Sequence, residues 1–190
     1  MRRDLGDGAW IERTEGFVPP DEAARAMSAL RDEAPWTQRA VTLFGRAHPQ
    51  PRLTCWMGDV GYTYSGLRWP PTPWHPAASA LRARVEAHLG ERFHGALLNL
   101  YRDGHDCMGM HADDEPEIAP GAPIASLSLG ATRRFVLLRK GADAREEIAL
   151  RHGDLLVMGG ATQALWRHGI PRERRVREAR VNLTLRRHCG

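Results

Sequence analysis

The stretch Arg180-Val-Asn-Leu-Thr-Leu-Arg186 alternates polar and apolar side chains without a break. Successive side chains of a β-strand point to opposite faces, so one face would carry Arg180, Asn182, Thr184 and Arg186 and the other would be wholly apolar. A polar face turned into a protein is costly unless it binds something, and two arginines suit a dicarboxylate. The alternative is a face in solvent, but such faces usually mix acids with bases, and this one has no acid.

The same two-residue period runs through most of the chain after Gly90. Turn-forming segments rich in Gly, Pro and Asp separate the candidate strands. These strands are 96–101, 123–130, 133–139, 146–150, 154–160, 164–170 and 180–187. Many short strands joined by short turns favour a closed or sandwiched antiparallel structure, a jelly roll or barrel.

Before Gly90 the pattern is partly helical. A helix is predicted over 21–34, where apolar residues fall on one face and Pro35 ends it. A second helix is predicted over 76–89, with Gly90 as its stop. The segment between them is rich in Pro, Gly and aromatic residues, which indicates hairpins and extended loops. The sequence therefore predicts an α+β, mainly β chain in which N-terminal helices flank a jelly roll.

Composition limits the function classes. The chain has 190 residues, enough for one domain with a core, and it shows no repeat or linker. No apolar run approaches the roughly 20 residues of a membrane span, and the basic start lacks the apolar core of a signal peptide. Three scattered cysteines argue against a disulfide framework, so we expect a cytoplasmic protein. The net charge of +4 is by itself a weak indication of a nucleic-acid partner.

The segment Gly109-Met-His-Ala-Asp-Asp-Glu-Pro-Glu117 carries the chemistry. In a strand or its extension, His111 and Asp113 point to the same side. In a jelly roll, His168 from a distant strand could join them. Two histidines and one carboxylate with open positions opposite suit non-haem Fe(II) oxygen chemistry. The alternative is that each is an ordinary surface residue.

These motifs carry a resemblance to a known family. The segments 99–137, 164–172 and 180–186, in that order and spacing, resemble the AlkB family of Fe(II)- and 2-oxoglutarate-dependent dioxygenases. The likeness spans about Phe44 to Arg187. The segments 41–52, 58–67 and 71–74 are similar to the branch that includes eukaryotic homologues acting on duplex DNA.

The resemblance implies a role for each matching residue. The iron ligands, and thereby the catalytic residues, would be His111, Asp113 and His168. The 2-oxoglutarate-binding residues would be Asn99, Tyr101, Arg180, Asn182, Thr184 and Arg186. The substrate-binding residues would be Phe44, Gly45 and Arg46 on a hairpin that reaches into the duplex, Tyr62, Thr63 and Tyr64 around the base, and Asp114 at its exocyclic group.

The resemblance also implies the function. We expect a DNA repair enzyme of the bacterial cytoplasm, associated with the nucleoid when acting, that uses Fe(II), 2-oxoglutarate and O2. It would demethylate 1-methyladenine and 3-methylcytosine in single- or double-stranded DNA and release formaldehyde, with no obligate protein partner. We expect one domain over 1–190, with helices and nucleotide-recognition hairpins over about 1–92 and the catalytic jelly roll over about 93–190.

Three alternatives stay open. An AlkB-type demethylase of RNA or protein would share the site residues and differ in the outer loops. A non-catalytic binder of damaged nucleic acid would have no need of a complete ligand set. A zinc hydrolase on a similar barrel would leave the two arginines of 180–186 unexplained.

Overall fold

The computed structural model describes residues 1–43, 46–64 and 67–189, with side chains described outside 41–47 and 62–68. Within these residues the chain forms fifteen strands and three helices. In chain order they are β1 (Arg2–Gly6), β2 (Ala9–Thr14), α1 (Pro20–Glu33), β3 (Ala40–Leu43), β4 (Arg46–Pro49), β5 (Leu53–Gly58), β6 (Tyr62–Tyr64), β7 (Leu67–Trp69), α2 (Pro76–Leu89), β8 (Gly95–Tyr101), β9 (Met108–His111), β10 (Ile124–Gly130), β11 (Arg133–Arg139), β12 (Arg145–Leu150), β13 (Leu155–Gly160), α3 (Thr162–Leu165), β14 (Trp166–Ile170) and β15 (Arg180–Arg186).

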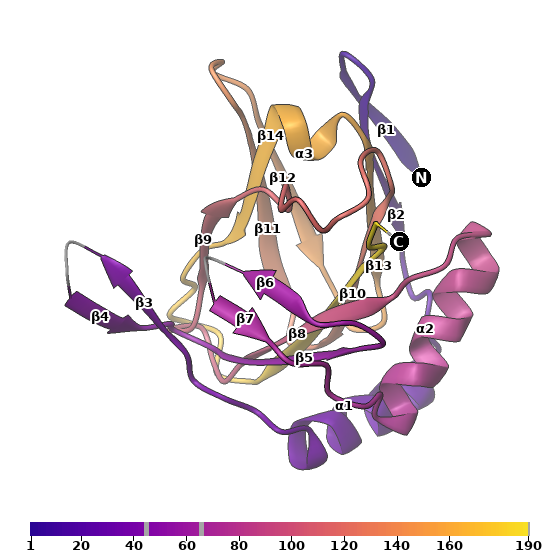
Figure 1. Cartoon of the computed structure of the whole chain (residues 1–190), viewed down its shortest axis with the longest axis vertical. Coiled ribbons are helices and arrows are strands. Elements are labelled where there is room, and N and C mark those ends of the chain that lie inside the picture. The colour runs from indigo at the N-terminus through magenta and orange to yellow at the C-terminus, as the bar shows by residue number, and fades with distance from the viewer. Residues whose placement is uncertain (44–45, 65–66, 190) are drawn as a thin grey trace.

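Two antiparallel sheets form the body of the molecule. The main sheet has seven strands in the order β1-β2-β13-β10-β15-β8-β5, and the smaller sheet has four in the order β12-β11-β14-β9. The two sheets face each other, and strands distant in sequence become neighbours (Figure 1). This arrangement confirms the predicted double-stranded β-helix, or jelly roll.

The strand β15 lies inside the main sheet, between β10 and β8. All seven of its residues are buried. Its apolar side chains Val181, Leu183 and Leu185 belong to the core cluster that also holds residues of α1 and α2. Its polar face therefore turns the other way, toward the smaller sheet. The alternative of a polar face in solvent is wrong.

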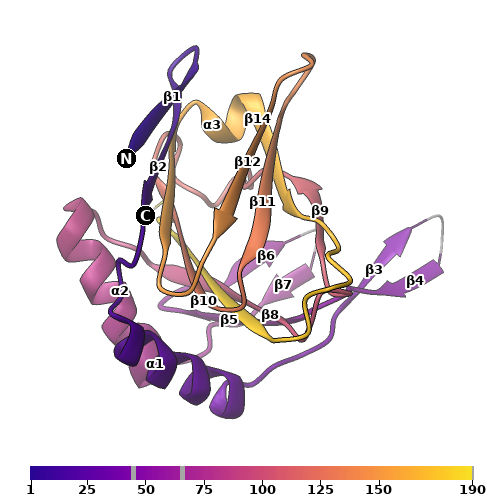
Figure 2. The same cartoon turned by 180° about the vertical axis from the view of Figure 1, so that it is seen from behind.

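The two long helices cover the outer face of the main sheet, side by side (Figure 2). The second runs from Pro76 to Leu89 as predicted, and it ends at Gly90, whose φ of 67° favours glycine. The first begins at Pro20 and ends at Glu33, one residue earlier than predicted. The residue before Pro35 is extended, because proline disfavours a helical conformation at the preceding position.

The structure differs from the sequence expectation at two places. The strands β1, β2 and β5 join the main sheet, so three of its seven strands come from before residue 93, where helices and hairpins were expected. The predicted strand 164–170 starts only at Trp166, because residues 162–165 form the single helical turn α3. The side chain of Thr162 anchors this turn to the main sheet.

Two hairpins lie beside the body, as expected for the segment between the helices. Figures 1 and 2 both show β3 and β4 reaching away from the sheets, while β6 and β7 lie closer to the body. The guanidinium of Arg39 stacks on the ring of Trp69 at 3.4 Å from its centroid, which connects the two hairpins. Among the described residues, no helix has the length and apolar character needed to span a membrane.

Candidate active site

Two histidines meet across the smaller sheet. His111 on β9 and His168 on β14 are direct cross-strand partners, and their ring centroids lie 4.3 Å apart. Asp113 follows two residues after His111 and is fully buried, with its carboxylate oxygens 3.8 Å from Nε2 of His111 and 3.7 Å from Nε2 of His168. One donor atom from each residue lies within 4.8 Å of the others. The predicted triad is therefore assembled as a cluster of possible metal ligands.

The hydrogen bonds of the triad leave its inner atoms available to a cation. Nδ1 of His111 lies 3.0 Å from the carbonyl oxygen of Gly109, so Nδ1 carries the proton and donates while Nε2 presents a lone pair. Nη2 of Arg186 donates to Oδ1 of Asp113 at 2.5 Å. Oδ2 of Asp113 is buried and has no hydrogen-bond partner in the described part of the chain. An orphaned carboxylate oxygen beside two imidazole nitrogens fits a divalent metal ion.

The protonation states suit metal binding. Burial, and next the neighbouring His111, lowers the pKa of His168 to about 3. Burial also lowers the pKa of His111. For Asp113, burial alone would raise the pKa, but Arg186 and the two histidines outweigh it, and the pKa lies below its usual value. At neutral pH the cluster thus offers two neutral imidazoles and one carboxylate.

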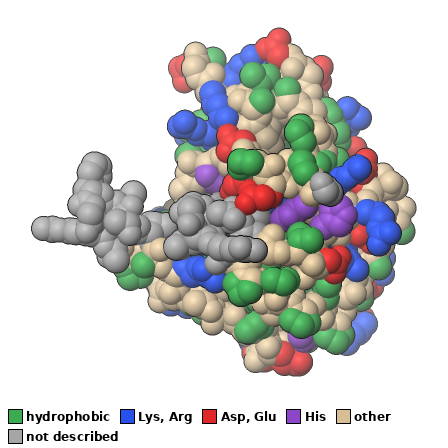
Figure 3. Space-filling view, viewed as in Figure 1, with side chains coloured by type: hydrophobic (Ala, Val, Ile, Leu, Met, Phe, Trp, Pro, Cys, Tyr) green, Lys and Arg blue, Asp and Glu red, His purple; other side chains and the backbone are tan. Residues whose placement is uncertain are grey.

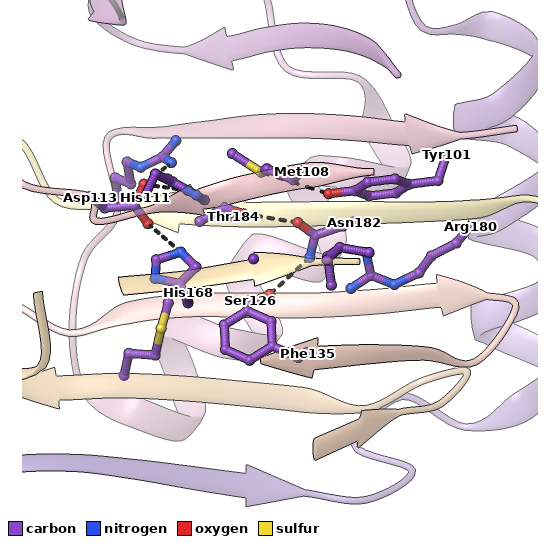
Figure 4. Close-up of a pocket in the computed structure, with 14 residues that line it drawn as sticks. Tyr101, Met108, His111, Asp113, Ser126, Phe135, His168, Arg180, Asn182 and Thr184 are labelled. Atoms are coloured by element: carbon purple, nitrogen blue, oxygen red, sulfur yellow. Dashed lines mark hydrogen bonds and ion pairs between the residues drawn. The ribbon is translucent and has the colours of Figure 1, made fainter. Parts of the chain in front are cut away.

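A cavity runs from this triad into the space between the two sheets. Figure 4 shows His111, Asp113 and His168 at one end and Arg180 at the other, with Thr184 and Asn182 between them. The hydroxyl of Thr184 donates to Oδ1 of Asn182, and Nδ2 of Asn182 donates to Oγ of Ser126, both at 2.9 Å. The polar face of β15 therefore lines the cavity wall.

The far end of the cavity holds a buried positive charge. Arg180 is 1% exposed, and its Nη2 donates to Oγ of Ser128 at 2.8 Å. Its Nε and Nη1 are buried without a partner among the described residues. Burial lowers its pKa to about 10, and the ring of Tyr101 lies 5.3 Å from the guanidinium carbon. Among the described residues Arg180 forms no salt bridge, and a buried guanidinium with two such free N–H groups indicates an anionic ligand; the distal carboxylate of 2-oxoglutarate fits this position.

The predicted cofactor residues fall into two groups. Those that line the cavity are Tyr101, Arg180, Asn182, Thr184 and Arg186. Asn99 pairs in register with Asn182, but its Oδ1 accepts a hydrogen bond from Nε of the buried Arg52 at 2.8 Å, and it does not line the cavity. The role assigned to each of these residues stays a prediction.

The predicted substrate residues are described only in part. Phe44 and Gly45 lie outside the described residues, and Arg46, Tyr62, Thr63 and Tyr64 are described in their backbone alone, within β4 and β6. The side chain of Asp114 is 64% exposed, in contrast to that of Asp113. It lies 3.5 Å from Nζ of Lys140. Figure 3 shows acidic side chains gathered over the loop between β9 and β10.

Several residues of the site were not expected from the sequence. Ser126 and Ser128 support Asn182 and Arg180, and the alternation of Ile124-Ala-Ser-Leu-Ser-Leu129 was the signal for them. The ring of Phe135 stacks on His168 at 5.2 Å. Arg133 is buried and donates to the carbonyl oxygens of Asp103, Asp106 and Pro171. No local signal marks an arginine as buried in this way.

Comparisons with known proteins agree with this geometry. The family model of the 2OG-Fe(II) oxygenase superfamily matches residues 12–186. The human alpha-ketoglutarate-dependent dioxygenase alkB homolog 3 is 43% identical over 181 residues, which are 90% of this chain and 63% of that protein. The mouse DNA oxidative demethylase ALKBH2 is 40% identical over 178 residues, which are 87% of this chain and 74% of that protein. The chain thus spans less than two thirds of the human relative's length.

A solved structure shows the same fold. That of OsALKBH1 matches 99% of this chain and 100% of its own with a TM-score of 0.70. The sequence identity to it is 18%, so this likeness concerns the fold alone.

Proposed function

Since this chain belongs to the 2OG-Fe(II) oxygenase superfamily, and within it to the AlkB family, we propose that it is a dioxygenase that oxidatively demethylates N-alkylated bases of DNA. The observation that carries the proposal is a cavity with three possible metal ligands at one end and, at the other, Arg180, whose Nε and Nη1 have no hydrogen-bond partner among the described residues. That pairing suits a metal and a dicarboxylate bound together. A relative whose name states DNA oxidative demethylase supports DNA as the substrate.

Different residues of the cavity would bind the metal ion and 2-oxoglutarate. His111, Asp113 and His168 would hold Fe(II), and Arg180 would bind the far carboxylate of 2-oxoglutarate. Arg186 would hold Asp113 in place through the contact to its Oδ1. When bound, iron, 2-oxoglutarate and O2 together supply an oxidant that hydroxylates an N-methyl group, so that succinate, carbon dioxide and formaldehyde are released.

The target base would have to leave the helix, because a methyl group on the pairing edge is inaccessible inside a duplex. In 1-methyladenine and 3-methylcytosine the methyl group blocks normal pairing, so extruding these bases costs less than extruding an intact base. Both are cationic, which suits a pocket with aromatic faces and a carboxylate. We assign the aromatic faces to Tyr62 and Tyr64, the carboxylate to Asp114, and the reach into the duplex to Phe44 and its hairpin.

The test is an assay of methyl loss. The protein would be incubated with Fe(II), ascorbate and 2-oxoglutarate on matched single-stranded and duplex DNA that carries either lesion, and mass spectrometry would follow the methyl group. We expect loss that requires 2-oxoglutarate and is abolished in His111→Ala. The ratio of duplex to single-strand rates tests Phe44. Absence of methyl loss from all DNA, with metal and 2-oxoglutarate shown to bind, would refute DNA as substrate and direct the search to methylated RNA and protein.

A further inference from the structure

The backbone of the buried aspartate is held from α3. The N–H of Asp113 donates to Oε1 of Gln163 at 2.9 Å. Gln163 precedes His168 by five residues and lies on the helical turn that leads into β14. One amide side chain therefore joins the loop that carries Asp113 to the segment that carries His168.

Gln163 is itself fixed in place. Its Nε2 lies 3.5 Å from Sδ of Met158, which sets the orientation of the amide so that Oε1 faces Asp113. Its carbonyl oxygen accepts a hydrogen bond from Nζ of Lys140, the only lysine of the sequence, at 3.0 Å. The preceding residue, Thr162, has its hydroxyl within 3.1 Å of the backbone of Trp10 and Gly159. Side chains near a metal are useful for orienting ligands only when they are held in this way.

The two adjacent aspartates differ in exposure, and each is linked to Gln163. Asp113 is bound by the side chain of Gln163, and Asp114 pairs with Lys140, which also donates to the carbonyl oxygen of Gln163. The side chain of Asp113 is fully buried, whereas that of Asp114 is 64% exposed and pairs with Lys140. Asp113 lies just beyond the end of β9, and no strand among the described residues fixes its backbone by a ladder hydrogen bond. The bond to Gln163 takes that place and sets the direction in which the carboxylate leaves the loop.

We propose that Gln163 is a positioning residue of the metal centre, which aims Asp113 by holding its backbone N–H, and that Lys140 supports it through the carbonyl of Gln163. This inference rests on the proposed metal site and adds to it. Loss of a partner that orients a metal ligand lowers metal affinity by about 10- to 100-fold. Gln163 acts through Asp113 and touches no reacting atom.

Co(II) titration without oxygen tests the proposal on the full chain, with the dissociation constant and the visible absorption band as readouts. We expect Gln163→Leu, which keeps the size and removes the acceptor, to raise the Co(II) Kd by about 10-fold or more and to change the band. Gln163→Glu keeps an acceptor oxygen for the N–H of Asp113 and should show no such loss of Co(II) affinity. Gln38→Leu removes another glutamine bound to a backbone carbonyl, that of Gln50, and should change neither readout.

A second pair of variants covers the case in which Gln163→Leu fails to fold. Lys140 is partly exposed, so Lys140→Met should fold and should raise the Co(II) Kd in the same direction, while Lys140→Arg should restore it. Native affinity and band in folded Gln163→Leu, or in Lys140→Met where the first does not fold, would overturn the inference. Failure of the native chain itself to bind Co(II) would instead refute the metal site on which both proposals rest.

Discussion

At the scale of single residues, Arg180 is a buried cation that the protein itself satisfies only in part, through Ser128 and the ring of Tyr101. Its guanidinium is buried, and Nε and Nη1 have no partner within the described ranges. Isolated buried charges cost several kcal/mol, and replacing them by apolar residues of similar size is often neutral or stabilising. We therefore expect Arg180 to favour ligand binding while lowering the free energy of unfolding of the ligand-free protein.

We expect Arg180→Leu to raise the Kd for 2-oxoglutarate by about 100-fold, because two charge-assisted hydrogen bonds are each worth about 1.5 kcal/mol. The melting temperature of the ligand-free protein should stay equal or rise, and the increase that 2-oxoglutarate gives the native protein should vanish. Calorimetric titration and thermal denaturation measure the two effects. Arg177→Leu, on an exposed loop, is the control, and unchanged affinity in Arg180→Leu would contradict the assignment.

A second residue-scale prediction concerns acid stability. Burial alone would raise the pKa of Asp106, but the hydrogen bonds from the side chain and backbone of Arg102 outweigh it and lower the pKa. A lowered folded-state pKa gives stability that is complete above the unfolded value of about 3.9 and is lost as pH falls through the folded value. We expect Asp106→Asn to be less stable than the native protein at pH 7, with a gap that narrows below about pH 4. Urea unfolding at both pH values measures this, and a gap independent of pH would contradict it.

At the scale of single residues, the sequence predicted those side chains of the site whose spacing along the chain follows a strand period. The spacing of His111 and Asp113 and the alternation of β15 identified the polar residues that the cavity brings together. The partners of Asn99 and Asp113 were not predictable, because Arg52 and Gln163 reach them only after the chain has folded. Hydrogen bonds across long sequence separations leave no periodic signal.

At the scale of elements, α3 has four residues and depends on its anchor. The hydroxyl of Thr162 contacts the carbonyl oxygens of Trp10 and Gly159 and the N–H of Trp10. We expect Thr162→Val, which keeps the shape, to lower the free energy of unfolding by about 1–3 kcal/mol because these buried groups lose their partner. Urea unfolding measures the loss. The exposed Thr132→Val should have almost no effect, and equal stability of the two variants would argue against the anchor.

The helices and strands that were predicted correctly have a regular spacing of apolar residues within their own sequence. The helix at 76–89 and the strands after Gly90 are of this kind. The turn α3 was missed because Thr162–Leu165 lies inside a run that also fits a strand. The strands β1 and β2 were missed because they are short and rich in charged residues. Pairing with β13 holds β2 in the sheet, and β1 joins the sheet by pairing with β2.

At the scale of the whole molecule, the N-terminal hairpin covers one edge of the main sheet. The strand β2 pairs with β13, buries Ala9 and Ile11 in the core between the sheets, and places Arg13 2.7 Å from Asp154. We expect removal of residues 1–15 to lower the melting temperature by several degrees, since burying one isoleucine alone is worth about 1.5–3 kcal/mol. The exposed edge of β13 should also promote self-association. Thermal denaturation and size-exclusion chromatography test both, and a monomer of native melting temperature would contradict the prediction.

The position of β15 between β10 and β8 has a consequence for how the protein is made. A ribosome that has released the chain up to Ile170 has already delivered His111, Asp113 and His168, but neither arginine of the cavity. At that stage β10 and β8 lack the strand that lies between them, so the two sheets cannot close. A nascent or truncated polypeptide would therefore carry the three side chains of the proposed metal site without the cavity proposed for 2-oxoglutarate. The cavity of the proposed site is therefore complete only once residues 180–186 have entered the sheet between β10 and β8.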